Sequence, residues 1–91
     1  MANNQTQPII NAALVGTSIV ISPPPQMQIP GHITLKSSDA TRKIELSTDN
    51  GVEYFTPAVD VQSATMQIVV VNAPITNIRI TGVAGDRYLV S

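Results

Sequence analysis

Apolar and polar residues alternate with a period of two along the last third of the chain, residues 65–91. The alternation is interrupted at Asn72-Ala73-Pro74 and again at residues 82–86, GVAGD. Short alternating runs bounded by Gly, Pro, Asn and Asp are typical of half-buried antiparallel strands. The pattern therefore predicts a three-strand meander. Its core-facing residues are expected to be Met66, Ile68, Val70, Ile78, Ile80, Tyr88 and Val90.

The opposite face of this meander is expected to be apolar at one end. Val69 and Val71 would point outward there, among Gln67, Asn77 and polar neighbours. A contiguous apolar patch on the outside of a sheet is typical of a protein–protein contact. Val69 and Val71 are therefore predicted interface residues.

Two more strand-like segments precede the meander, at residues 17–22 and 32–37. The first holds Ile19-Val20-Ile21, a β-branched run that fits a strand covered on both faces, and the second places Ile33 and Leu35 inward. Between them Pro23-Pro24-Pro25 forces extended backbone and removes three donors. Residues 22–31 are therefore expected to cross from one sheet to another, with Met27 and Ile29 against the core.

A hairpin is predicted at Asp49-Asn50-Gly51, the strongest turn signal in the chain. A two-residue turn would pair Leu46 with Phe55, whereas a three-residue loop with a bulge at Gly51 would pair Leu46 with Tyr54. The second register is preferred, because it gathers the better apolar set on one face. Phe55 then points away from that face as a predicted interface anchor; the alternative is that it fills the edge of the core. The apolar set that the preferred register gathers on one face comprises Ile44, Leu46, Val52 and Tyr54.

Seven or eight short strands at a spacing of about 8–12 residues predict an all-β protein. The expected fold is a small antiparallel β-sandwich, immunoglobulin-like or jelly-roll. Residues 17–91 are expected to form this single domain, and residues 1–16 a partly extended N-terminal arm. The apolar pair Ile9 and Ile10 in that arm is predicted to contribute to an interface.

Composition narrows the possible functions. Only 12% of the residues are charged, the net charge is −1, and Cys is absent. The chain has no cluster of Lys and Arg of the kind that binds nucleic acid, and no apolar run of about 18 residues that would span a membrane. It also has no signal-peptide pattern at its start. Neither a nucleic acid nor a membrane is an expected partner.

Candidate catalytic residues are not found. His32 is the only histidine and is expected to be an exposed residue at the start of a strand. The acidic residues are scattered singly, which offers no acid–base pair. No metal and no cofactor is expected; a calcium site between Asp39 and Asp49 is an alternative that no EF-hand spacing supports. The chain is therefore expected not to be an enzyme.

Two segments resemble parts of the small immunoglobulin-like or jelly-roll β-domains of bacteriophage virion proteins. They are KIELSTDNGVEYFTP at 43–57 and PITNIRITGVAGDRYLVS at 74–91. The resemblance implies a non-enzymatic structural protein of a phage particle, made in the host cytoplasm and located in the virion. Such a protein would be a capsid decoration or cement subunit, or a small tail or neck component. Its expected partners are itself, in a homo-oligomer with a trimer favoured, and a major capsid or tail protein.

The alternative function is that of a carbohydrate-binding or adhesion β-module. This function predicts an exposed aromatic platform or a calcium site at one end of the sandwich. Tyr54 and Phe55 are adjacent on one strand and therefore point to opposite faces, so they do not form such a platform by themselves.

Overall fold

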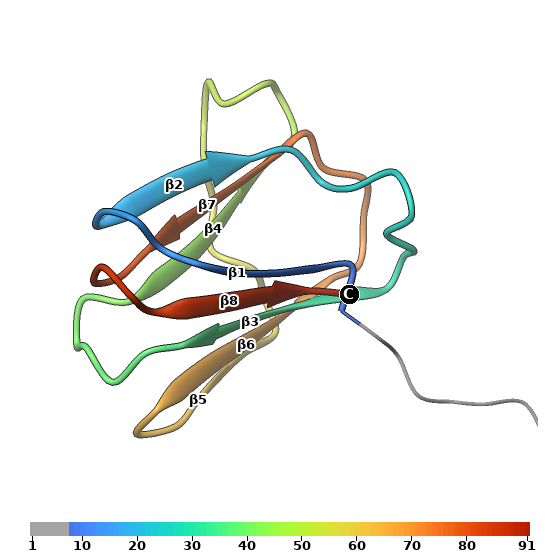
Figure 1. Ribbon diagram of the computed structural model, residues 1–91. Coiled ribbons are helices and arrows are strands. Elements are labelled where there is room, and N and C mark those ends of the chain that lie inside the picture. The colour runs from blue at the N-terminus through green and yellow to red at the C-terminus, as the bar shows by residue number, and fades with distance from the viewer. Residues whose placement is uncertain (1–7) are drawn as a thin grey trace, which may run out of the picture.

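The computed structural model describes residues 8–91 as two packed antiparallel β-sheets, and no helix occurs in that range (Figure 1). The predicted all-β sandwich is therefore confirmed. The strands are β1 Ile10–Ala13, β2 Ser18–Ile21, β3 Gly31–Lys36, β4 Lys43–Ser47, β5 Asp60–Gln62, β6 Met66–Val71, β7 Asn77–Thr81 and β8 Arg87–Val90.

The larger sheet has the strand order β1-β8-β3-β6-β5 and the smaller has β2-β7-β4. The chain changes sheet at nearly every connection, and only β5 and β6 form a hairpin within one sheet. Residues 22–30 carry the chain from β2 to β3, so the crossover predicted from the triproline is present. Met27 packs against the core as expected, whereas Ile29 remains exposed.

The core lies between the two sheets and consists of aliphatic side chains and one tyrosine. In β3, β4, β7 and β8 the residues predicted to face inward are buried. Because direct cross-strand partners share a face of a sheet, the pairing of these strands places them together. The buried apolar residues are Leu14, Ile33, Leu35, Ile44, Leu46, Val69, Val71, Ile78, Ile80, Tyr88 and Val90.

Strand β6 faces the opposite way from the prediction. Val69 lies directly opposite the buried Ile33, and both Val69 and Val71 are in the core, so neither is available at the surface. Met66, Ile68 and Val70 are on the outer face instead. In the run MQIVVV one alternating set of residues is entirely apolar and the other is apolar except for Gln67, so periodicity does not decide which face of the strand is buried. The one polar residue that turns inward, Gln67, donates its amide N–H to Asp60 Oδ1 at 2.9 Å.

The hairpin predicted at Asp49-Asn50-Gly51 is reduced to a turn with one bridge, and its register differs from the prediction. Asn50 has φ 61° and Gly51 has φ 85°, the two positive values that a two-residue type I′ turn requires. Leu46 therefore pairs with Phe55, with backbone hydrogen bonds of 2.9 and 2.8 Å. Tyr54 lies under the guanidinium of Arg79 rather than in the core. Val52, expected inside, is 78% exposed.

The N-terminal part of the sandwich begins earlier than residue 17. Strand β1 pairs with β8 along its whole length, and Leu14 belongs to the core. Residues 10–14 are therefore part of the domain, and the expected boundary at residue 16 falls inside it. Residues 1–7 of the predicted arm lie outside the described residues. On β2, Val20 is exposed, so this strand is covered on one face only.

Arg42 links the two sheets at one end of the sandwich. Its guanidinium donates to the carbonyl of Ser37 at 2.8 Å and, from two nitrogens, to Oε1 of Gln62 at 3.0 and 2.8 Å. It also donates to the carbonyl of Ser63 in the β5–β6 turn. This planar group with several donors fixes the β5–β6 hairpin against the β3–β4 turn.

Candidate interaction surface

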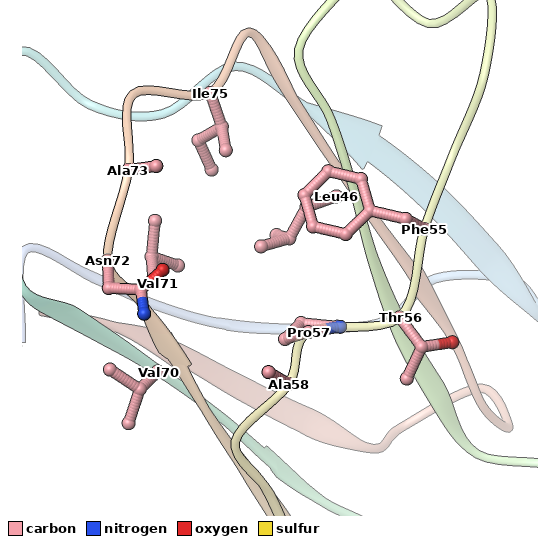
Figure 2. Close-up of a pocket in the computed structure, with 10 residues that line it drawn as sticks. All are labelled: Leu46, Phe55, Thr56, Pro57, Ala58, Val70, Val71, Asn72, Ala73 and Ile75. Atoms are coloured by element: carbon pink, nitrogen blue, oxygen red, sulfur yellow. The ribbon is translucent and has the colours of Figure 1, made fainter.

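An apolar pocket of about 240 Å³ opens between the two sheets at one end of the sandwich (Figure 2). Leu46 of β4 and Val71 of β6 contribute to it from the two sheets. Val70, residues 55–58 and three residues of the β6–β7 loop form the rest of its lining, and no charged residue is among them. The lining residues are Leu46, Phe55, Thr56, Pro57, Ala58, Val70, Val71, Asn72, Ala73 and Ile75.

The pocket exists because the chain leaves the smaller sheet early. After the type I′ turn only the Leu46–Phe55 bridge joins the returning segment to β4, and the buried Pro57 has no N–H with which to continue a ladder. The segment then crosses to β5 in the larger sheet. Phe55 is left at the pocket with 46% of its surface exposed.

A second pocket of about 220 Å³ shares Ile75 with the first and extends the apolar surface. Its other lining residues come from the β2–β3 crossover and from Pro74 in the β6–β7 loop. The exposed Ile29 is one of these lining residues. We call the combined surface the apolar end. It includes Pro23, Pro24, Met27, Ile29, Phe55, Ala73, Pro74 and Ile75.

The predicted interface residues fall in three different places. Phe55 is at the apolar end, and Ile9 is exposed beside a third pocket that also contains His32. Ile10 in β1 lies opposite Val90 of β8 and packs against the core, so it is only partly exposed. Val69 and Val71 are core residues, and Val71 reaches the first pocket only as part of its lining. Phe55 and Val71 are thus brought together, and the other three are not.

Sequence reasoning missed Ile75. The sequence did offer a signal for it, because Ile75 is a single large apolar residue directly after the turn residues Asn72-Ala73-Pro74. In the structure the β6–β7 loop joins the two sheets, and this places Ile75 between both pockets.

The isolated polar candidates do not combine into a site. Asp39 accepts hydrogen bonds from the hydroxyl and the backbone N–H of Thr41, which lower the pKa of its carboxyl group. The backbone N–H of Glu53 and the hydroxyl of Ser47 lower the pKa of Asp49 in the same way. The two aspartates flank opposite ends of β4, so each orders its own turn and they do not share a calcium site. His32 is exposed on β3, as expected.

Neither a metal cluster nor an aromatic platform is found in the part of the chain that the structure describes. No group of three or more His, Cys, Asp or Glu side chains in residues 8–91 is arranged to hold a metal ion. The ring of Tyr54 is covered by Arg79, whose guanidinium carbon lies 3.9 Å from the ring centroid and whose Nη2 pairs with Glu45 at 2.9 Å. Tyr54 is therefore not a free stacking surface.

Comparison with known proteins does not place the chain in a family. No family model matches it, and no match is found among curated proteins or solved structures. Among the described residues there is also no helix long and apolar enough to cross a membrane.

Proposed function

We propose that this chain is a non-enzymatic structural protein of a phage particle. It is a capsid decoration or cement subunit, or a small tail or neck component, and it acts through protein–protein contacts. It assembles with copies of itself, with a trimer favoured, and attaches to a major capsid or tail protein. The observation that carries the proposal is the apolar end, where Phe55 stands half-exposed beside a pocket that no charged residue lines.

Such a surface suits a partner's apolar side chain. Burying apolar surface stabilises a contact by about 25 cal/mol per Å², and an uncharged pocket adds no cost of desolvating a charge. Aromatic residues at the centre of a contact commonly contribute most of its energy. Phe55 has this position, because its ring points into the pocket (Figure 2) and 46% of its surface remains exposed.

The sheet edges support self-association. The chain contains no Asp, Glu, Lys or Arg before Lys36, so β1 and β2, which form one edge of each sheet, are both uncharged. Proteins usually protect an open edge with charge, proline or cover from another chain. Because a short connection, residues 14–17, joins β1 to β2, a neighbouring subunit that covers one edge would lie close to the other.

Replacing Phe55 by Ala tests the attachment. Particles are isolated from the source culture on a density gradient, and the copies of the protein per particle are counted by quantitative mass spectrometry. Phe55→Ala is expected to weaken attachment about thirtyfold, as the loss of about 2 kcal/mol implies. The matched control is Val83→Ala, because Val83 is 43% exposed in the β7–β8 turn and lines neither pocket of the apolar end. Val83→Ala should leave attachment unchanged.

Two results would contradict the proposal. One is that the unaltered protein is missing from the particle fraction. The other is that Phe55→Ala and Val83→Ala attach equally well, since the apolar end would then contribute nothing to attachment.

A further inference from the structure

The outer face of the larger sheet carries two cations and no carboxylate. Lys36 on β3 lies directly opposite Arg87 on β8, and both side chains are exposed. The outward-facing apolar residues of β6 and β8 surround them. We call this surface the cationic face. It comprises Lys36, Met66, Ile68, Arg87 and Leu89.

This arrangement is unfavourable in an isolated subunit. Like charges directly opposite each other on neighbouring strands destabilise a sheet. Among residues 8–91, neither Lys36 nor Arg87 forms a salt bridge. Arg87 donates only to the neutral Oδ1 of Asn11, at 2.7 Å. The carboxylate of Asp60, on β5 of the same sheet, accepts hydrogen bonds from Gln62 and Gln67 instead, and that of Asp86, which precedes Arg87 in the chain, accepts one from the N–H of Val83. A counter-charge from another molecule would relieve the repulsion.

The matching surface is at the 48–53 turn of the same chain. Asp49 and Glu53 lie in the same turn as Val52, which is 78% exposed. Asp49 accepts hydrogen bonds from the Ser47 hydroxyl and the Glu53 N–H through Oδ1, and neither carboxylate forms a salt bridge within the described residues. We call residues 49–53 the acidic tip. In Figure 1 it is the yellow-green loop that projects beyond the smaller sheet at the top of the view. Glu45 of the neighbouring strand pairs with Arg79, so it does not belong to this surface.

We propose that the acidic tip of one copy docks on the cationic face of a second copy. Val52 would contact Ile68 and Leu89, and the carboxylates of Asp49 and Glu53 would pair with Lys36 and Arg87. The inference rests on the proposed self-association and adds a specific pair of surfaces to the uncharged edges of β1 and β2.

Charge complementarity selects this arrangement over a face-to-face dimer. Two cationic faces in contact would bring four cations together, and such juxtaposition of like charges costs several kcal/mol. The acidic tip and the cationic face are different surfaces, so the contact between two copies is heterologous. Heterologous contacts close into a ring when the rotation that relates successive copies returns to the first copy. A ring of three copies is the favoured product.

Charge reversal tests the contact directly. The variants are Lys36→Glu, Glu53→Lys and the double variant that carries both, and association is measured by sedimentation velocity over a concentration series. Each single variant should weaken self-association at least about tenfold, which corresponds to 1.4 kcal/mol. The double variant should recover association, because the reversed tip then meets the reversed face. Raising NaCl from about 50 to about 500 mM should weaken the unaltered oligomer, because these exposed charges are screened.

The matched control is Lys43→Glu, which changes the net charge by the same amount on the smaller sheet. Lys43 is largely exposed and lies 3.9 Å from Glu45, so its reversal should leave association unchanged. Circular dichroism confirms that each variant keeps the β-sandwich.

The outcomes separate this inference from the proposed function. An oligomer that is insensitive to both single reversals, or one that the double variant fails to restore, overturns the inference and leaves the proposed function intact. A monomeric unaltered protein at every concentration contradicts the inference and the proposed self-association together.

Discussion

Replacing Val69 by Asp is expected to unfold the protein or to lower its free energy of unfolding by at least about 4 kcal/mol. Val69 has no exposed surface and lies opposite Ile33 in the core, with Asp60 as its partner on β5. A carboxylate at this position would lose its hydration without gaining a cation. Because a small domain has a total stability of about 5–15 kcal/mol, the variant should be largely or entirely unfolded at room temperature. Urea denaturation followed by circular dichroism measures the loss.

The matched variant is Val70→Asp, the same change one residue further along β6. Val70 is on the outer face and only partly buried, so the cost should be about 1 kcal/mol. The reverse order, with Val70→Asp more damaging than Val69→Asp, would show that β6 faces the other way. Val69 and Val71 would then be surface residues after all.

Replacing Gly31 by Ala is expected to cost about 3 kcal/mol, because the added methyl group overpacks a site enclosed by backbone. A Cβ at this position would lie 2.8 Å from the carbonyl oxygen of Gln28 and 3.0 Å from that of Ser91. The Ser91 carbonyl cannot move away easily, since it accepts a 2.7 Å hydrogen bond from the N–H of His32. Thermal and urea unfolding both report the change.

Gly16→Ala is the control for that substitution. No atom lies within 4 Å of the position that its Cβ would take, so its effect on the free energy of unfolding should stay within about 0.5 kcal/mol. Equal stability of the Gly31 and Gly16 variants would contradict the close packing of the crossover against the end of β8.

The buried face of a strand is predictable from sequence where only one of its two alternating sets of residues is apolar. In β7, Ile78 and Ile80 alternate with Asn77, Arg79 and Thr81, so hydrophobic periodicity alone gives the buried face. In β6 both alternations are apolar, and the buried face depends on pairing with β3 and β5, which no local pattern contains. The polar Gln67 misleads such reasoning, because its buried amide N–H donates to Asp60 of the neighbouring strand β5.

The hairpin illustrates a second limit. Choosing the register that gathers the most apolar residues favours Tyr54 inside, whereas the turn chemistry of Asn50-Gly51 favours the other register. The turn determines the register. Tyr54 then lies outside the core, where the guanidinium of Arg79 on β7 packs over its ring. Phe55 was expected to point away from the face of Leu46, whereas the observed register places it opposite Leu46 on that face, where it stays half-exposed at the edge of the core.

The cationic face and the acidic tip were not predictable in this way. Lys36 and Arg87 are 51 residues apart in the chain and become neighbours only because β3 pairs with β8. The strand order, in which β8 lies between β1 and β3, is a property of the whole fold. The acidic tip is a single continuous segment of the chain. The cationic face that complements its charge forms only when β3 and β8 pair in the folded sheet.

The most direct test of the central claim, that this chain works by assembling with other protein subunits, is the molar mass of the unaltered protein in solution. Multi-angle light scattering across a concentration series should give a multiple of the 9.7 kDa chain mass, with about three times that mass favoured. A constant value of 9.7 kDa at every concentration, together with no binding to particles, would contradict the account.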